Sequence, residues 1–433
     1  MRRGFGVGRS AQNGAATLVV VMVLFLVMAL LAAYANRSLM FEQRISGSYY
    51  RASLAQEMAE GGVEWTVAML NGTGIDASCQ PVSSGGTRFA DKYLAISSVD
   101  RSVQSKTAAA LEFAVDCART GNTLVCRCPA PNDRTAQPAT TVQGLLVPSF
   151  GLALGTDVTL HYGSFQVTSQ GCSDSSVDNC RTDGAEGRSP KAIATSVQTA
   201  SIAFIAAVPS SPASPLTVKG SLTTTGSGGL GLHNTDPASS GLLVVSGGTA
   251  PALVDARMDS VPGTPPAQAR IFDDAGLSSL SADWFFRTYM GMAPSRYQNH
   301  PSLRVVTCPA GDCGPALQAA YAAGQRILWI AGPMTIASNV VIGAVNDPPL
   351  IIVNGNVVLS GPMQINGMLV ALGDLAWSNT GGLTSLITGM VLVQGDMTAT
   401  GSMDIQYLQS IANQLRNRQG SYARVSGSLI DAD

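Results

Sequence analysis

Hydrophobic positions are concentrated in one unbroken stretch close to the N-terminus. Residues 15–35, AATLVVVMVLFLVMALLAAYA, carry no charge, and a helix of this length spans roughly 30 Å, the thickness of the hydrocarbon core of a bilayer. The residues before it include Arg2, Arg3 and Arg9 but no acidic residue. Because cytoplasmic segments next to a membrane helix are enriched in basic residues, we predict that the N-terminus stays in the cytoplasm and that the rest of the chain is exported.

The helical pattern continues past the apolar stretch. No proline occurs before Pro81, and helix-forming residues predominate up to Leu70. Asn71 and Gly72 then supply a stop, because both residue types tolerate the left-handed conformation. We predict one helix over residues 15–70, whose first half (15–35) crosses the membrane and whose second half packs on a globular domain. The second half has an apolar side with Leu54, Met58 and Val63 and an acidic side with Glu57, Glu60 and Glu64.

From residue 71 to about residue 207 the pattern changes to short alternating stretches in loops rich in Ser, Gly and Asp. Residues 158–170, VTLHYGSFQVTSQ, alternate apolar and polar side chains and predict an antiparallel hairpin around Gly163. Residues 191–207, KAIATSVQTASIAFIAA, would add a long strand to the same sheet. We expect a small antiparallel sheet over residues 71–207 to pack on the outer half of the helix.

A Pro/Ser linker at residues 208–215 separates this part from a C-terminal domain, residues 216–433. Four copies of one phrase follow the linker, each with a short alternating run, a glycine, a polar residue and a second run. In the last three copies the first glycines recur at intervals of about 20 residues, which is typical of stacked coils in a parallel β-helix. Hairpins in a sandwich would explain the alternation but not the repeat. The copies are LTVKGSLTTTG at 216, IIVNGNVVLSG at 351, LVALGDLAWSNTG at 369 and LVQGDMTATGS at 392.

The C-terminal domain also contains helical segments. We predict helices at 283–290 and 315–325, within an insertion spanning about 281–325, and an amphipathic helix at 407–420 before a short final strand. The expected fold class is therefore α+β. It combines a long N-terminal membrane-spanning helix, a small antiparallel sheet and a β-rich C-terminal domain of coils like those of a parallel β-helix.

Composition limits the partners of the 433-residue chain. Only 12% of its residues are charged and its formal net charge is −2, which argues against nucleic acid as a partner. The 8 cysteines lie beyond the membrane segment, where an oxidising compartment favours disulfides. Zinc is the competing interpretation, although the 3 histidines leave few ligands. We expect the local pairs Cys172–Cys180 and Cys308–Cys313, and Cys117 joined to Cys126 or Cys128, with Cys79 joined to the other.

The N-terminal features resemble a type IV prepilin, with a leader over residues 1–14 that ends at Gly14 and a mature chain that starts at Ala15. More specifically, residues 42–64 resemble the N-terminal family of PilX-type minor pilins. In that family an E-x-R-hydrophobic-small-Gly stretch precedes an Arg and an Ala-Glu-Ala/Gly run. The resemblance covers the chain up to about residue 70, and the matching positions are Glu42, Arg44, Gly47, Arg51, Ala55, Ala59 and Glu60.

Two positions depart from the usual prepilin pattern. Asn13 stands before Gly14 where Lys or Arg is usual, which weakens the cleavage assignment. Val19 stands where a major pilin has a glutamate that is thought to meet the N-terminal amine of the neighbouring subunit. A subunit with nothing ahead of it has no such amine, and an unpaired carboxylate in lipid costs several kcal/mol. Val19 therefore fits a subunit at the tip or at the start of assembly. In this respect the chain resembles the K-type pseudopilin of type II secretion.

The resemblance implies a minor pilin that takes part in initiating the type IV pilus. It would lie in the inner membrane, be cut by prepilin peptidase and join other minor and major pilins through its helix. The C-terminal domain would then lie outermost at the cell surface. The extended C-terminal part also resembles the extension on some PilX-type proteins. The alternatives are a tip-displayed adhesin for a surface or glycan, a polysaccharide-acting enzyme, a type II secretion pseudopilin and an uncleaved signal anchor.

Motifs for chemistry are absent from the sequence. It contains no G-x-S-x-G, H-E-x-x-H or Walker A phrase, so we predict no enzymatic activity, no cofactor and no metal site. The acids Asp273, Asp274 and Asp283 could form a glycosidase pair, but loop and helix-start positions favour capping roles. The acidic loop 174–187 lacks the alternating ligands of a calcium loop.

Overall fold

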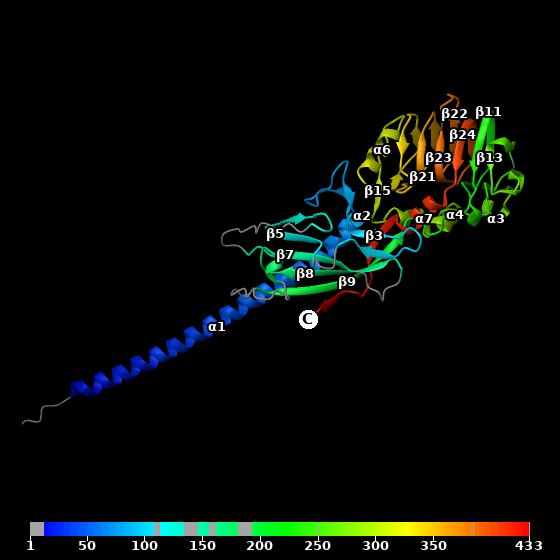
Figure 1. The fold of residues 1–433 in the computed structure, drawn as a ribbon. Helices are drawn as coiled ribbons and strands as arrows, with labels where there is room; N and C mark the ends of the chain where they lie inside the picture. The colour runs from blue at the N-terminus through cyan, green and yellow to red at the C-terminus, as the bar shows by residue number, and fades with distance from the viewer. Residues whose placement is uncertain are drawn as a thin grey trace, which may run out of the picture.

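The protein consists of a projecting helix, an antiparallel domain around the outer part of that helix and a curled parallel sheet beyond the helix end (Figure 1). The computed structural model describes residues 13–107, 113–133, 146–155, 162–180, 193–249, 251–383 and 385–432. The order of the three parts and the α+β class are those predicted from the sequence.

The projecting helix, α1 (Asn13–Leu70), is continuous and confirms the predicted end at Leu70. The stop forms differently from the expectation, because neither Asn71 nor Gly72 has a positive φ. Instead, the side-chain amide of Asn71 donates to the carbonyl of Val67 over 2.8 Å. The side chain of Asn71 therefore adds a second donor to a carbonyl of the last turn that also accepts from the backbone N–H of Asn71 over 3.3 Å, and no left-handed turn is needed.

The antiparallel domain is built on a 7-stranded sheet with the order β25-β9-β8-β7-β5-β6, in which β26 also pairs with β9. Smaller elements beside it are the strand pairs β1–β2 and β3–β4 and the helix α2 (Phe89–Tyr93). The long strand β9 confirms the prediction for residues 191–207. The strands are β1 (Gly74–Ile75), β2 (Thr87–Arg88), β3 (Leu94–Ile96), β4 (Val103–Ser105), β5 (Val115–Thr120), β6 (Thr123–Arg127), β7 (Ser149–Gly155), β8 (Ser164–Cys172), β9 (Thr195–Ala206), β25 (Gly420–Arg424) and β26 (Ile430–Ala432).

The predicted hairpin around Gly163 lies partly outside the described residues, and the final strands of the chain belong to this sheet. Gly163 has the positive φ of a turn residue, at 85°, but residues 156–161, in the first arm of the predicted hairpin, lie outside the described residues. The final strands differ from the prediction that residues 216–433 form one domain. β25 and β26 pair antiparallel with β9, because the edge of β9 offers unpaired backbone groups that a returning strand satisfies.

Helix α1 lies close against the antiparallel sheet because small residues face each other. Ala55 and Ala59 are fully buried, and a Cβ added to Gly171 on β8 would lie 1.9 Å from the carbonyl oxygen of Ala55. In the same way, a Cβ added to Gly62 would lie 2.1 Å from the Oγ of Ser169. The helix is therefore held at a distance that larger side chains would not allow.

The C-terminal domain is a 15-stranded sheet that curls around an apolar core containing Trp377, whereas Trp329 lies in a second apolar cluster with Phe285 and Phe286. Each of its strand pairs among the described residues is parallel, which excludes the hairpin sandwich, because hairpins pair antiparallel. The strands are β10 (Leu216–Val218), β11 (Leu222–His233), β12 (Val244–Ser246), β13 (Met258–Asp259), β14 (Arg270–Ile271), β15 (Leu303–Val305), β16 (Ile327–Ile330), β17 (Met334–Ile336), β18 (Val341–Ile342), β19 (Leu350–Val353), β20 (Val357–Ser360), β21 (Gln364–Ala371), β22 (Leu375–Asn379), β23 (Leu386–Val393) and β24 (Met397–Gln406).

A row of side-chain hydrogen bonds between adjacent coils explains the repeated sequence pattern. The Oδ1 of Asn356 accepts a hydrogen bond from the backbone N–H of Asp374 over 3.0 Å, and Asp374 accepts in turn from the N–H of Asp396 over 2.9 Å. Asp396 accepts from the N–H of Ser221 over 2.7 Å. The polar residue after the first glycine in each of the last three copies therefore satisfies a backbone donor of the adjacent coil.

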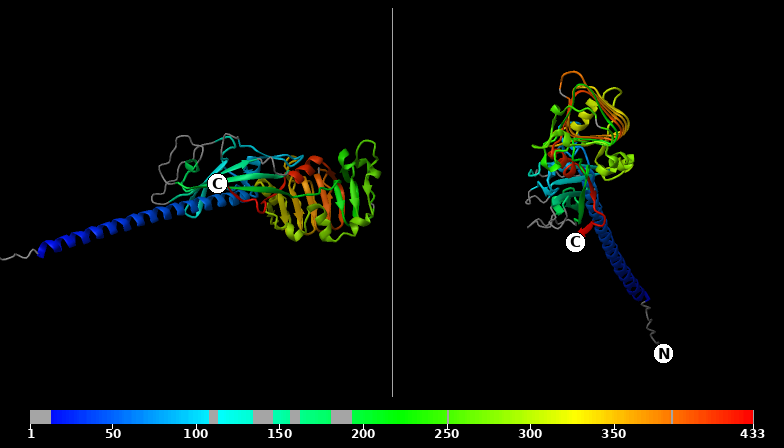
Figure 2. Two further views of the ribbon diagram at one scale, coloured as in Figure 1. Left: turned by 90° about the horizontal axis from the view of Figure 1, so that it is seen from below. Right: turned by 90° about the vertical axis from the view of Figure 1, so that its right-hand side faces the viewer.

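The coils are not stacked in chain order. Leu216, in the first coil, lies between Val391 on β23 and Val244 on β12. The coils farthest from the antiparallel domain therefore come first in the chain. The chain then returns along the side of the domain to β15, and the coils that follow β15 stack on one another until β23 pairs with β10 (Figure 2). Helices predicted at 283–290, 315–325 and 407–420 are present as α4, α6 and α7. The helices of the domain are α3 (Ala275–Ser278), α4 (Ala282–Met290), α5 (Pro294–Tyr297), α6 (Gly314–Ala322) and α7 (Gln409–Asn417), and the 3₁₀ turns of the chain are η1 (Val177–Cys180), η2 (Pro237–Ser239), η3 (Asp255–Arg257) and η4 (Pro266–Gln268).

Candidate functional site

The projecting half of α1, residues 16–50, is exposed, and its first part, residues 16–35, is a large apolar surface. Every side chain from residue 16 to residue 50 is exposed, with Val19 at 58% and Phe25 at 75%. Among the described helices, this one alone is long and apolar enough to cross a membrane, with a mean hydropathy of 3.0 in its most apolar window. An apolar surface of this extent requires lipid or other apolar helices around it.

The predicted cleavage and tip residues lie at the free end of this helix. Gly14 and Ala15 belong to its first turns, and their side-chain surroundings lie outside the part of the chain that the structure describes. Val19 lies further along, within the apolar segment. No described charged residue precedes Arg37 on the helix, so the apolar segment at this end is uninterrupted.

The family-motif residues divide between the projecting half and the docked half of α1. Those on the docked half make the contacts with the sheet, and Glu60 accepts a hydrogen bond from the Nε2 of Gln198 over 3.3 Å. The exposed members are Glu42, Arg44, Gly47 and Glu60, Arg51 is half-buried, and Ala55 and Ala59 are buried.

Four disulfides join all the cysteines, and no free thiol remains. Two are the local pairs expected from spacing, and the other two select one of the alternatives that the sequence left open. With every cysteine oxidised, the zinc interpretation lacks its thiolate ligands. The pairs are Cys79–Cys128, Cys117–Cys126, Cys172–Cys180 and Cys308–Cys313.

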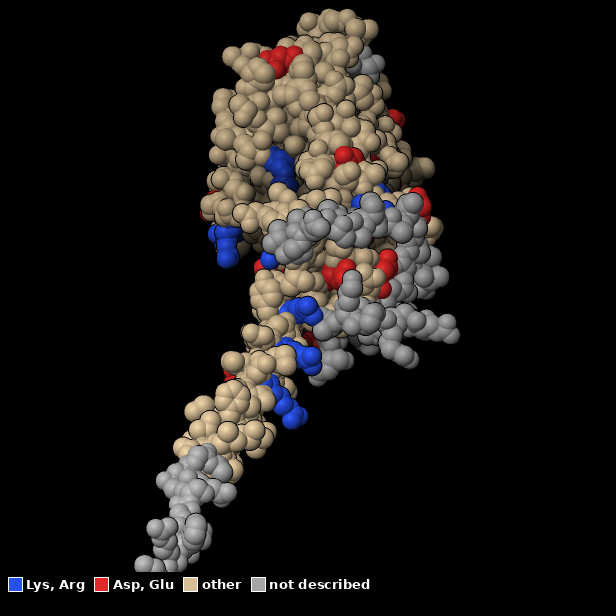
Figure 3. All heavy atoms as spheres, turned by 90° about the vertical axis from the view of Figure 1, so that its left-hand side faces the viewer, with Lys and Arg blue, Asp and Glu red and all other residues tan. Residues whose placement is uncertain are grey.

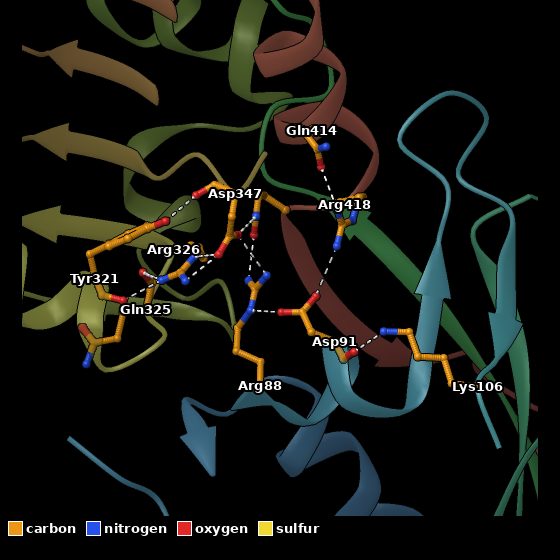
Figure 4. Close-up of polar contacts among 10 residues, drawn as sticks. Arg88, Asp91, Lys106, Tyr321, Gln325, Arg326, Asp347, Gln414 and Arg418 are labelled. Carbon is orange, nitrogen blue, oxygen red and sulfur yellow. Dashed lines mark hydrogen bonds and ion pairs between the residues drawn. The ribbon is translucent and has the colours of Figure 1, made fainter. Parts of the chain in front are cut away.

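A network of charged side chains joins the antiparallel domain to the curled sheet (Figure 4). Arg88, from β2, pairs with Asp91 over 2.6 Å and reaches Asp347, in the curled-sheet domain, over 3.3 Å. Arg326 donates two hydrogen bonds to the other oxygen of Asp347, from its Nε over 2.8 Å and from its Nη2 over 2.6 Å. Gln419 donates to Asp347 over 2.8 Å and accepts from Arg88 over 2.8 Å. Segments far apart in sequence are therefore held together by one carboxylate.

The shifted pKa values of Asp347 and Arg88 show that both groups stay ionised at this junction. Burial alone would raise the pKa of Asp347, but hydrogen bonds from Arg326 and the charges of Arg88 and Arg326 outweigh it and hold the pKa below its ordinary value. Burial likewise opposes the charge of Arg88, and Asp91 and Asp347 overcome it, so the pKa of Arg88 is raised. The network therefore remains charged near neutral pH.

Asn71 forms a second junction at the end of α1. Its Nδ2 donates to the carbonyl of Tyr422 and its Oδ1 accepts from the N–H of Tyr422, each over 2.8 Å. The same Oδ1 accepts from Ser302, and the carbonyl of Asn71 accepts from Arg304 over 2.7 Å. Asn71 therefore connects the helix, the returning strand β25 and the coil that contains β15.

His300 is buried beside this junction. Its Nδ1 shares a hydrogen bond with the Oγ of Ser421, and its ring stacks on Tyr297 with 5.3 Å between centroids. Burial lowers the pKa of His300 to about 4, so the imidazole is neutral at physiological pH. The histidine is a packed core residue of the interface.

A polar cluster that sequence spacing did not reveal lies near the far end of the curled sheet. The Nδ1 of His233 lies 2.8 Å from Asp259 and its Nε2 3.2 Å from Asp404, and Arg257 also pairs with Asp404. The hydrogen bond with Asp404 is the main cause that raises the pKa of His233 against the opposing effect of burial. His233, Asp259 and Asp404 line a surface pocket of about 350 Å³, and the other residues of its lining are Thr235, Leu386, Gln406 and Tyr407.

The acids weighed as catalytic or calcium-binding residues have local roles. Asp274 caps α3 by accepting from the N–H of Leu277 over 3.0 Å, as expected. Asp283 lies inside the first turn of α4, whose cap is Ser281. Within the described residues no group of three His, Cys, Asp or Glu side chains is arranged to hold a metal ion. The part of the acidic loop that contains Asp183 and Glu186 lies outside those residues.

Comparison with known proteins agrees with the geometry of the helix. The model of the family described as PilX N-terminal matches residues 13–64, which is most of α1. This segment is thus similar to the N-terminal helix of a type IV pilus-related pilin, and the apolar helix fits a membrane-anchored protein of that kind. No curated protein and no solved structure matches the chain.

Proposed function

We propose that this chain is a minor pilin that takes part in starting the assembly of a type IV pilus and that occupies the tip of the fibre. The observation that carries the proposal is the two-part helix α1, with one half packed on its own domain and the other half exposed and apolar. Such a helix is stable in a bilayer and, equally, among similar helices in a filament. Prepilin peptidase would cut after Gly14, and other pilins would supply the surrounding helices.

Two features support the tip position. Val19 leaves the position of the usual pilin glutamate without a carboxylate, so the chain does not require an amine from a subunit ahead of it. The curled sheet extends beyond the end of α1, away from the membrane segment (Figure 1). A subunit stacked ahead would meet this domain, whereas residues 16–50 of α1 are exposed to subunits added from the membrane side.

The experiment uses the native host with its gene deleted and the full-length chain restored. The full-length chain is necessary because β25 and β26, at its C-terminal end, complete the antiparallel sheet. We expect piliation to be lost and then restored, with gold-labelled protein at single fibre ends. Labelled protein distributed along the fibres would contradict the tip position, and normal piliation without the gene would contradict the assembly role.

A second candidate is that the curled sheet is an adhesive module that the pilus presents. The pocket of Asp259, His233 and Thr235 favours it, because carboxylate, imidazole and hydroxyl groups in a shallow hollow can bind sugar hydroxyls. Asp259 is well exposed, at 68% of its side chain. Glycan-array binding by whole pili that is lost in Asp259→Asn, with piliation retained, would support this role, and unchanged array binding would exclude this pocket.

A further inference from the structure

The projecting half of α1 carries its basic residues on one side. Arg37, Arg44 and Arg51 are spaced by one heptad, so they recur on nearly the same face of the helix, about 10.5 Å apart along its axis. Figure 3 shows basic side chains in a line along one side of the projecting helix. We call the face that contains Arg37, Arg44 and Arg51 the arginine stripe.

The arginine stripe continues the helix face that the antiparallel domain already covers. At 3.6 residues per turn, Arg51 is followed on the same side by Ala55, Met58 and Gly62, and these three residues are buried against the sheet. The stripe therefore lies directly below the chain's own antiparallel domain, on the side nearer the membrane. The acidic residue of the projecting half, Glu42, falls on the opposite face by the same spacing.

Aromatic side chains accompany the arginines on this face. Tyr34 and Phe41 are 77% and 65% exposed, and both line a surface hollow of α1 together with Arg37 and Arg44. Tyrosine and arginine are enriched among residues that carry binding energy at protein interfaces. The face therefore has the composition of a protein contact.

Lipid does not account for the stripe. The headgroup layer adds only about 6 Å on each side of the hydrocarbon core. Arg37 follows the apolar segment directly and reaches that layer, whereas Arg44 and Arg51 lie about 10 and 20 Å further along the axis. They lie where a neighbouring globular domain would be in a filament of parallel, axially displaced subunits.

The structure indicates the charge of the surface that would fit. The chain's own antiparallel domain carries acidic side chains gathered on the face seen in Figure 3, above the basic line of the helix. Burial is the main cause that raises the pKa of Asp116, on β5; the charge of Asp178 adds to this effect, whereas Arg127, at 3.6 Å, opposes it. A translation along the helix axis would bring such an acidic face opposite an arginine stripe, and repeated translations of this kind build open filaments.

We propose that the arginine stripe is a docking surface for an acidic patch on the antiparallel domain of a neighbouring pilin that lies nearer the membrane. The inference rests on the proposed function, since it requires that the chain enters a filament. Charge complementarity would fix the axial register of the two subunits, while apolar contacts of the membrane segment supply much of the affinity.

The first test compares two charge changes on opposite faces of the helix. Full-length Arg37→Glu/Arg44→Glu and the control Glu42→Arg are expressed in the pilus-bearing host, and the fraction of each that co-purifies with sheared filaments is measured. We expect the double variant to fall at least tenfold and the control to stay within twofold of wild type, with equal amounts of all three in the membrane. Equal co-purification of the double variant would overturn the proposal. Absence of the wild-type chain from filaments would instead overturn the proposed function.

The second test identifies the occupant. A photocrosslinking amino acid replaces Phe41 on the stripe or, as the control, Leu39 on the opposite side of the same turn, and the linked peptides are identified by mass spectrometry. Links from position 41 to acidic peptides in the globular domain of another pilin would support the proposal, and links to a second copy of this chain would contradict the tip position on which it rests. Links only to lipid, or only to the α1 helix of another subunit, would contradict it.

Discussion

The side chain of Asn71 forms two hydrogen bonds with the backbone of Tyr422, 351 residues further along the chain. The amide thereby takes the place that a neighbouring strand would have, with one donor and one acceptor matched to one residue of β25. Ser302 and Arg304, in the coil that contains β15, donate hydrogen bonds to the same asparagine. The end of α1 is therefore the point at which the three parts of the molecule meet.

Asn71→Ala should destabilise this meeting point. The variant leaves the N–H and carbonyl of buried Tyr422 without partners, which costs about 2–4 kcal/mol for two such groups. We expect faster hydrogen exchange in β25 of the full-length protein in detergent. Asn299→Ala, at an exposed position, is the control, and equal exchange rates in the two variants would show that the asparagine bridge does not hold the strand.

The close contact between Gly171 and α1 predicts a steric effect. Gly171→Ala would place its Cβ 1.9 Å from the Ala55 carbonyl oxygen, so the helix must move from the sheet at a cost of about 2–4 kcal/mol. We expect rapid proteolysis between the projecting and docked halves of α1. Gly61→Ala has open space around it and should be neutral or stabilising. Equal protease resistance of Gly171→Ala and wild type would contradict the packing described here.

Asp347 should be the residue on which the relative position of the two domains depends. Asp347→Ala removes the ion-pair partner of Arg326 and leaves Arg88 with Asp91 alone, and breaking a partly buried pair in this way costs about 3 kcal/mol. We expect small-angle scattering of the detergent-solubilised protein to show a wider range of domain orientations. Asp283→Ala, which removes an exposed pair with Arg287, is the matched control. A scattering profile unchanged by Asp347→Ala would mean that other contacts hold the domains.

His300 predicts a loss of stability in acid. Its pKa is about 4 in the folded protein because it is buried, whereas an unfolded histidine titrates near 6.5. As the pH falls from about 6.5 to 4, the unfolded chain takes up a proton that the folded chain refuses, so up to about 3 kcal/mol of stability is lost. His300→Gln should lose less stability than wild type between pH 7 and pH 5 in denaturation experiments. A parallel pH dependence of the two proteins would contradict this assignment.

His233 predicts the opposite sign. Its pKa is raised in the folded protein, chiefly by the hydrogen bond with Asp404, so its contribution is complete below the ordinary value near 6.5 and is lost as the pH rises through the raised value. Hydrogen exchange in β11 and β13 should therefore quicken between pH 6 and pH 8 after correction for intrinsic rates. His233→Gln should remove this pH dependence, and its persistence in the variant would exclude His233 as the cause.

Local signals predicted much of this fold. The apolar stretch and the absence of proline gave the full length of α1, and the polar residue after each repeat glycine marked the corners that Asn356, Asp374 and Asp396 form. Short spacing also predicted the disulfides Cys172–Cys180 and Cys308–Cys313. In each case the interacting groups lie close in sequence or recur at a fixed interval, so a single chain contains the information.

The features that the sequence did not reveal depend on contacts between distant segments. Nothing near Leu216 indicates that it stacks on Val391, since either end of the repeat would fit an adjacent coil equally well. The return of β25 to β9 and the pairing of Arg88 with Asp347 are likewise decided by tertiary packing. The partners of His233 lie far from it in sequence, and only the meeting of three coils brings Asp259 and Asp404 to it.

The central claim is that α1 leaves the membrane as part of a processed filament subunit. Mass spectrometry of the N-terminus of the protein recovered with sheared pili tests this most directly. The account predicts a mature chain that begins at Ala15. A chain that still carries Arg2 and Arg3, found only in the membrane fraction and never with filaments, would contradict it.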